Sequence, residues 1–213
     1  MKFNSEMLKA YFVCGSQDLD GQDFEKLLEK SIESGITAFQ FRDKGSSTLT
    51  SQERLELGER LRDICRSEKV PFIVDDDVEL ANKLSADGIH VGQKDEQIKK
   101  VIAETSPDMM IGLSAQTLDQ IKIANKIKRI DYIGAGPIFP TTSKPDAVDP
   151  MGLSLLNDMS HASKVPIVAI GGILKSNLRS LRDNGAVGAA FITLITQSDD
   201  IEASVKDVLN VFD

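Results

Sequence analysis

Short apolar runs alternate with amphipathic stretches along the whole chain, and this alternation constrains the fold more than any other feature. Eight apolar runs have the length of buried strands, and they span residues 10–13, 38–41, 71–74, 88–91, 110–113, 132–135, 166–170 and 188–192. Eight further stretches carry apolar residues at helical spacing, and they span residues 24–34, 51–67, 78–84, 97–104, 118–127, 153–162, 176–184 and 201–212. Strict alternation of strands and helices predicts a parallel sheet.

Eight strand–helix units in 213 residues favour a closed (β/α)8 barrel, the TIM barrel, formed as a single domain over residues 1–213. An open, doubly wound sheet is the alternative fold, because periodicity does not show whether the sheet closes. In a barrel of this kind the active site lies at the carboxyl ends of the strands. The turns that follow the strands are therefore where we look for chemistry.

Charge and cysteine content narrow the class of protein. The formal net charge is −8 and no block rich in Lys and Arg is present, which argues against nucleic acid or an anionic membrane as a partner. The two cysteines, Cys14 and Cys65, lie far apart, as is typical of a reduced chain. No apolar segment has the length of a signal or a membrane span, so we expect a cytoplasmic protein. A homo-oligomer is left open.

The turn after the second strand, in the sequence FQFRDKG, has an unusual polar face. Strand alternation places Gln40, Arg42 and Lys44 on one side, with Phe41 and Asp43 on the other. One reading is a solvated strand end. The other is a grip for a polyanion, with a bidentate guanidinium and a mobile ammonium group.

Carboxylates follow the third and fourth strands. Asp76 with Glu79 matches a capping box, and Asp95 also suits a helix N-cap. Taken together, Asp76 and Asp95 come from adjacent strand ends, where two carboxylates suit Mg²⁺ with substrate phosphate oxygens. No Cys/His cluster predicts zinc. His90, at the end of the fourth strand, fits a packed strand-end residue better than a catalyst.

The later turns supply hydroxyls and glycines. Ser114 ends the fifth strand, whereas Thr117 with Gln120 matches a structural capping box. The turn after the sixth strand combines hydroxyls with one cation in the sequence PTTSKPDA. Gly171 and Gly172 after the seventh strand allow backbone N–H groups to approach a ligand, although a tight turn alone would also use them. The turns after strands seven and eight commonly hold phosphate in such barrels. Ile192 and Thr193 lie at the end of the eighth strand, so we expect them at this phosphate site.

Six motifs at these turns resemble, in order, the signatures of the thiamine-phosphate synthase family, and they cover residues 38 to 193. They are FQFRDKG, PFIVDDDVELA, ADGIHVGQKD, IGLSAQT, DYIGAGPIFPTTSK and VPIVAIGGI. The resemblance implies a (β/α)8 transferase that requires Mg²⁺. It would join hydroxymethylpyrimidine diphosphate to hydroxyethylthiazole phosphate, giving thiamine phosphate and pyrophosphate.

The same resemblance implies a role for each matching residue. Diphosphate-binding residues would be Gln40, Arg42, Lys44 and Ser114, with Thr141, Ser143 and Lys144 from the turn after the sixth strand; Asp76 and Asp95 would be the magnesium ligands, and Gly172, Ile192 and Thr193 the thiazole-phosphate cradle.

Three positions depart from the family pattern. Asp75 stands where the family usually has Asn, so a substrate-facing amide becomes a carboxylate that repels diphosphate or binds metal itself. Ser143 replaces Thr and keeps the hydroxyl, and Thr193 replaces Ser at a position where the backbone N–H would bind.

The resemblance suggests a dissociative substitution. Arg42, Lys44, Lys144 and Mg²⁺ would stabilise the departing diphosphate, and no general base is needed. Rival readings are a related barrel that isomerises the thiazole precursor, a thiamine-phosphate binder without activity, and an unrelated phosphosugar isomerase. The first two should lack part of the set of cations and aspartates present here. The third would need an acid/base residue at the barrel mouth, and none stands out.

Overall fold

Eight parallel strands form a closed barrel in the computed structural model, which describes residues 2–93, 98–141 and 149–213. The strands are β1 Ala10–Cys14, β2 Ala38–Phe41, β3 Phe72–Asp75, β4 Gly88–Val91, β5 Met110–Ala115, β6 Tyr132–Ala135, β7 Ile167–Ile170 and β8 Gly188–Phe191. Each strand pairs with the next, and β8 pairs with β1 to close the ring. The predicted barrel is confirmed, and the open sheet is wrong.

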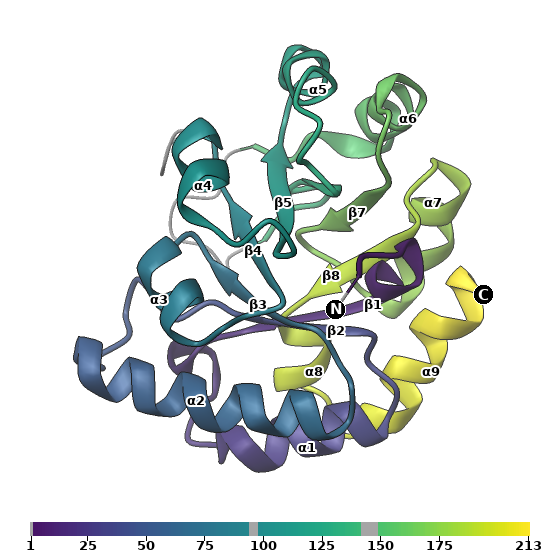
Figure 1. The fold of residues 1–213 in the computed structure, drawn as a ribbon. Coiled ribbons are helices and arrows are strands. Elements are labelled where there is room, and N and C mark those ends of the chain that lie inside the picture. The colour runs from purple at the N-terminus through teal and green to yellow at the C-terminus, as the bar shows by residue number, and fades with distance from the viewer. Residues whose placement is uncertain (1, 94–97, 142–148) are drawn as a thin grey trace.

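Helices ring the outside of the strands (Figure 1). They are α1 Phe24–Glu33, α2 Ser51–Ser67, α3 Val78–Lys83, α4 Ile98–Glu104, α5 Leu118–Ala124, α6 Gly152–Ala162, α7 Leu178–Asp183, α8 Thr193–Thr196 and α9 Ile201–Phe212, with the 3-10 turns η1 Ser5–Leu8, η2 Ser16–Asp18 and η3 Lys175–Asn177. All eight predicted helices are present. The short helix α8, which follows β8 directly, was not predicted.

Side chains alternate between two apolar layers, as the period of a strand requires. Outward-facing residues such as Phe12, Phe39 and Phe72 pack between the sheet and the helices. Inward-facing residues such as Tyr11 and Tyr132 belong to a separate cluster that fills the barrel. The interior is therefore a packed core, and chemistry is left to the ends of the strands.

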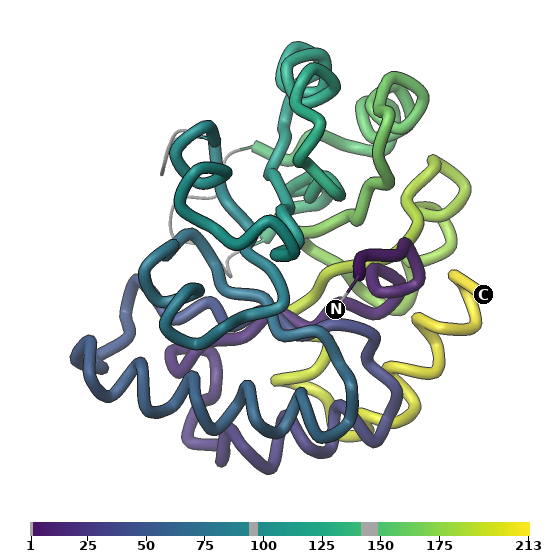
Figure 2. The backbone as a smooth tube through the Cα atoms, viewed as in Figure 1, coloured from purple at the N-terminus to yellow at the C-terminus, as the bar shows by residue number. Residues whose placement is uncertain are grey.

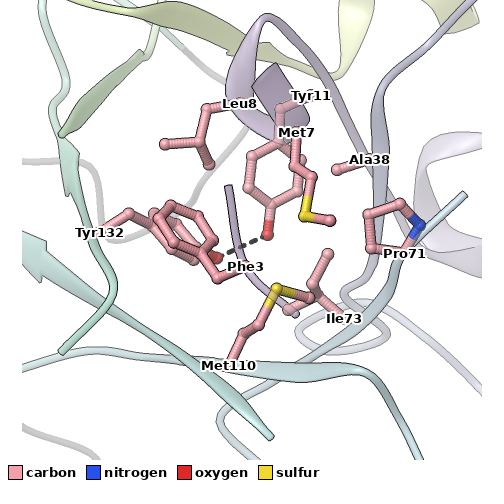
Figure 3. Close-up of a pocket in the computed structure, with 9 residues that line it drawn as sticks. All are labelled: Phe3, Met7, Leu8, Tyr11, Ala38, Pro71, Ile73, Met110 and Tyr132. Atoms are coloured by element: carbon pink, nitrogen blue, oxygen red, sulfur yellow. Dashed lines mark hydrogen bonds between the residues drawn. The ribbon is translucent and has the colours of Figure 1, made fainter. Parts of the chain in front are cut away.

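The amino-terminal end of the barrel is closed by an apolar floor, shown in Figure 3. Phe3, Met7 and Leu8 lie there against Met110 and Pro71, around a small apolar cavity. The residues that line this cavity are hydrophobic and carry no charge. A polar ligand is consequently directed to the opposite end, where the strands finish.

The chain makes one circuit of the barrel, so its last helix comes back beside its first elements (Figure 2). Helix α9 returns to pack beside α1, and Lys9 Nζ lies 2.7 Å from a carboxylate oxygen of Asp213. Within residues 2–93, 98–141 and 149–213, no helix has the length and apolar character needed to cross a membrane.

Candidate active site

The end of β2 presents its polar face to the barrel, as the alternation predicted. Gln40 lies inside, where its Nε2 donates to the Tyr11 hydroxyl at 2.9 Å. Arg42 Nε lies 3.5 Å, and Lys44 Nζ 2.8 Å, from Asp75 Oδ2. The two predicted cations are thus brought together at the mouth, and both face the same carboxylate.

The turn after β3 differs from the predicted capping box. Asp77, not Asp76, is the N-cap of α3, because its side chain accepts the N–H of Leu80. The chain needs one more residue to turn, and Asp76 occupies that position with a φ of 59°. A left-handed conformation is costly for a residue other than glycine and is frequent at functional sites.

This turn leaves the Asp76 carboxylate at the mouth instead of at the helix end. Its Oδ1 accepts the N–H of Gly92 at 3.1 Å, and its Oδ2 contacts Lys44 Nζ. The backbone N–H of Asp76 donates to the carbonyl of His90 at 2.8 Å. The backbone and the side chain of Asp76 are therefore both hydrogen-bonded to the end of β4, and these bonds fix the Asp76 carboxylate at the mouth.

Two cations and two carboxylates thus share a partly enclosed space and balance in charge. The Asp75 side chain is only 7% exposed, and its Oδ2 accepts no hydrogen bond from the residues that the structure describes. Its contacts with Lys44 and Arg42 are ion pairs. A buried carboxylate oxygen of this kind retains capacity for a further donor or a cation.

The donor set at the mouth fits Mg²⁺. Carboxylate oxygens are the ligands that this ion prefers, and it commonly takes one or two with water and phosphate. Asp75 and Asp76 offer such oxygens. Asp95, the second predicted ligand, lies outside the described residues. Within the described ranges, no group of three or more His, Cys, Asp or Glu side chains gathers as a metal site.

The fifth and fourth strands meet at the predicted serine. Ser114 Oγ lies 3.0 Å from His90 Nε2, and its carbonyl accepts the Gln93 side-chain amide at 2.7 Å. The Thr117 capping box is confirmed, with the Thr117 side chain and that of Gln120 each accepting from the other's backbone. Thr117 is thus structural, whereas Ser114 faces the interior.

The turns after β6 and β7 pack on one another. The N–H groups of Ile138 and Phe139 donate to the carbonyls of Ile170 and Gly171 at 2.9 and 3.1 Å. Gly171 and Gly172 have φ values of 97° and 63°, and a Cβ at Gly172 would lie 2.5 Å from the carbonyl oxygen of Pro140. Close packing and backbone conformation together explain these glycines.

The predicted turn residues are described only in part. Thr141 is the last described residue after β6, and Ser143 and Lys144 lie outside the described residues. At the end of β8, Ile192 is the N-cap of α8 and Thr193 is its first residue. The N–H groups of a first helical turn have no partner within the helix, which agrees with a backbone anion site here.

Comparison with known proteins decides the family. Residues 10–195 match the family model described as thiamine monophosphate synthase. The chain is also 50% identical over 209 residues to the thiamine-phosphate synthase of Lactiplantibacillus plantarum, which covers 98% of this chain and 96% of the relative. The chain belongs to the thiamine monophosphate synthase family. The relationship predicted from the six motifs is confirmed.

Other members of the thiamine monophosphate synthase family support the assignment. The thiamine-phosphate synthase of Listeria monocytogenes is 44% identical over 205 residues, covering 95% of this chain and 96% of the relative. A solved structure of thiamine phosphate pyrophosphorylase from Pyrococcus furiosus superposes with a TM-score of 0.86 and 32% identity, covering 98% of this chain and 96% of that one. Fold and family therefore agree over nearly the whole length.

Sequence reasoning missed the residues that hold the β2 turn of this family member. Gln17 Nε2 donates to the carbonyl of Arg42 at 2.8 Å, and Gln17 Oε1 accepts the N–H of Lys44 at 3.3 Å. The buried carboxylate of Asp43 accepts from the Ser16 backbone at 2.9 Å and from the Ser47 hydroxyl at 2.7 Å. One sign of this role is visible in the sequence. Asp43 is a charged residue on the side of the β2 turn that continues the apolar face of the strand.

Proposed function

We propose that this chain is a thiamine-phosphate synthase. It joins 4-amino-2-methyl-5-hydroxymethylpyrimidine diphosphate to hydroxyethylthiazole phosphate and releases thiamine phosphate and pyrophosphate, which makes it a transferase. The observation that carries the proposal is the pair of cations, Arg42 and Lys44, held at the mouth against the buried carboxylate of Asp75. Two fixed positive charges at one strand end match a diphosphate leaving group.

The chain's own residues stabilise the departing diphosphate. The aminopyrimidine delocalises positive charge at its exocyclic CH₂, so that the C–O bond breaks before the thiazole nitrogen attacks. Arg42 and Lys44, with Lys144 from the turn after β6, supply positive charge where negative charge develops. The thiazole nitrogen carries its own electron pair, so the step requires no general base.

The site also offers ligands for a magnesium ion. When bound, Mg²⁺ would neutralise diphosphate charge and make the diphosphate a better leaving group. Asp76 and Asp95 would hold the ion, and Asp75 lies close enough to Asp76 to assist. The left-handed turn at Asp76 and the Oδ2 of Asp75, which accepts no hydrogen bond from the described residues, support this assignment.

Neutral groups complete the substrate contacts. Gln40, Ser114, Thr141 and Ser143 offer hydrogen bonds without adding charge that would retain the product. Gly172, Ile192 and Thr193 form the thiazole-phosphate cradle, in agreement with the start of α8 at Thr193 and with the usual phosphate site of such barrels. The single domain over residues 1–213, the cytoplasmic location and a homo-oligomer stay predictions.

The pairing of cations and aspartates also separates this proposal from its rivals. A thiazole isomerase or a binder without activity has no need for Arg42 and Lys44 set against Asp75 and Asp76. The retained charges favour the synthase.

Pyrophosphate release on mixing the protein with both substrates, with and without Mg²⁺, tests the activity. We expect Arg42→Ala to lower turnover by about 100–1,000-fold, because a preorganised charge at the leaving group is lost. Arg60→Ala is the matched control, since Arg60 of α2 pairs with Glu25 of α1 on the outer surface of the barrel and should leave turnover unchanged. Release without any need for Mg²⁺, or Arg42→Ala turnover within a few-fold of wild type, would contradict the proposal.

A further inference from the structure

A chain of hydrogen bonds crosses the barrel interior between two predicted substrate residues. Gln40 Nε2 donates to the Tyr11 hydroxyl at 2.9 Å, and the hydroxyls of Tyr11 and Tyr132 lie 2.8 Å apart (Figure 3). The Tyr132 hydroxyl lies 3.2 Å from His90 Nδ1, and His90 Nε2 lies 3.0 Å from Ser114 Oγ. Five strands, β2, β1, β6, β4 and β5, contribute one residue each.

The packing around this chain leaves room for nothing larger than hydrogen. A Cβ at Gly112 would lie 2.2 Å from Tyr132 Cζ and 2.4 Å from His90 Nδ1. A Cβ at Gly134 would lie 2.8 Å from His90 Cε1. Neither glycine has a positive φ, so the backbone alone does not require them. Both glycines make space for the imidazole and the phenol.

Burial makes the hydrogen bonds of the two tyrosines obligatory. Tyr11 is 1% exposed and Tyr132 is 2% exposed, so their hydroxyls have no water to turn to and need protein partners. Desolvation raises the pKa of both tyrosines above the ordinary value of 10.0. Both hydroxyls are thus neutral and each has one hydrogen to donate.

These constraints fix which atom donates and which accepts at each hydrogen bond between Gln40 and Ser114. Because the Tyr11 oxygen accepts from Gln40, the Tyr11 hydrogen points to Tyr132. If Tyr132 donated to Tyr11 instead, the Tyr11 hydrogen would have no acceptor in the chain, which is costly in a buried site. The Tyr132 hydrogen then points to His90 Nδ1. A neutral imidazole that accepts at Nδ1 carries its hydrogen at Nε2, so His90 donates to Ser114 Oγ.

We propose that His90 is a positioning residue that fixes Ser114 as a hydrogen-bond donor toward the barrel mouth. With its oxygen accepting from His90 Nε2, the Ser114 hydroxyl directs its own hydrogen to an anionic oxygen of the substrate. Tyr132 and Tyr11 act one step earlier, by holding His90 in the Nε2–H tautomer. The inference rests on the proposed function in one respect, namely that the anionic oxygen belongs to the pyrimidine diphosphate.

Nitrogen NMR of the protein without substrate tests the tautomer independently of activity. The chain has two histidines, His90 and His161, so ¹⁵N-histidine labelling with the exposed-helix variant His161→Gln assigns both rings. We expect His90 to carry its hydrogen on Nε2, and Tyr132→Phe to weaken that preference. A His90 ring protonated at Nδ1 alone in the wild type would overturn the inference, whether or not the protein is a synthase.

Kinetics test the route through Ser114. We expect Tyr132→Phe and His90→Phe to lower kcat/KM for the pyrimidine diphosphate by about 10–100-fold, equivalent to about 1.4–2.8 kcal/mol. The KM for the thiazole phosphate should stay within about twofold. His90→Gln keeps an amide N–H near the Nε2 position and should recover most of the loss, and His161→Gln should behave as wild type.

A double-mutant cycle separates positioning from mere packing. In a Ser114→Ala background, His90→Phe should cost less than about a further twofold, because the proposed route through Ser114 is already removed. Fully multiplicative losses, or a His90→Gln variant as impaired as His90→Phe, would overturn the inference. If His90→Phe fails to fold, Tyr132→Phe removes one oxygen atom and serves the same cycle. Wild-type protein without Mg²⁺-dependent pyrophosphate release would refute the proposed function instead.

Discussion

Replacing Asp75 by Asn should strengthen the binding of diphosphate and weaken the fold. The Asp75 carboxylate lies 2.8 Å from Lys44 Nζ and 3.5 Å from Arg42 Nε, so a substrate diphosphate must displace it from both cations. Together with Asp76, these groups carry no net charge. Asp75→Asn would leave one net positive charge at the mouth, with almost no change in side-chain volume.

The size of the effect follows from these distances. At an effective dielectric of about 20, the two attractions amount to roughly 6 and 5 kcal/mol. Desolvation of the three groups offsets most of this, and Lys44, at 36% exposure, is partly screened by water and keeps Asp76 as a partner. We therefore expect a net loss of about 1–3 kcal/mol of folding free energy, which lowers Tm by about 2–12 °C.

The folding free energy that Asp75→Asn loses should appear as a gain in the free energy of pyrophosphate binding. Because Asp75 no longer competes for Arg42 and Lys44, the affinity for pyrophosphate should rise by about 5–150-fold, which corresponds to about 1–3 kcal/mol. Calorimetric titration with pyrophosphate, with and without Mg²⁺, measures this affinity, and thermal unfolding measures the stability.

A matched control lies two residues away. Asp77→Asn makes the same change of charge, but Asp77 pairs with Arg54 and caps α3. Asn is also a good N-cap, so this variant should lose some stability and leave pyrophosphate affinity within about twofold of wild type. Weaker pyrophosphate binding by Asp75→Asn in the absence of Mg²⁺, together with an unchanged Tm, would refute the reasoning.

Two further predictions concern the support of the site and its buried core. Gly15→Ala should cost about 1–3 kcal/mol and also lower turnover, because a Cβ would lie 2.1 Å from the carbonyl oxygen of Arg42; thermal unfolding and the pyrophosphate assay measure both, and unchanged turnover would contradict it. The chain has two tyrosines and no tryptophan, so tyrosinate absorbance reports on Tyr11 and Tyr132 alone. Burial raises both pKa values above 10.0, so this contribution to stability is present below pH 10.0 and is lost as the pH rises through the higher folded values. Tyrosinate should appear together with the loss of circular dichroism, and reversible titration near pH 10 with the fold intact would contradict this.

Local periodicity of apolar residues in the sequence was enough to predict most of the fold. The eight apolar runs became strands and the eight amphipathic stretches became helices, because alternation with a period of 2 or 3.6 depends only on near neighbours in the chain. The same period placed Arg42 and Lys44, which follow β2, on the same side as Gln40. It did not place the cap of α3, since Asp76 and Asp77 are equally good N-caps by residue type. The choice depended on where β3 ends and how the turn meets β4.

The family and the polar strand ends were therefore predictable from the sequence, whereas the partners of these residues were decided by the tertiary structure. Tyr11 and Tyr132 are 121 positions apart, and nothing in either motif announces that their hydroxyls meet. Their contact depends on strand register and on closure of the ring, which bring opposite strands within reach across one interior. His90 and Ser114 lie on the neighbouring strands β4 and β5, and the register of that pair makes an ordinary strand-end residue the partner of Ser114. Such contacts depend on how all eight strands are arranged, and no local pattern in the sequence predicts them.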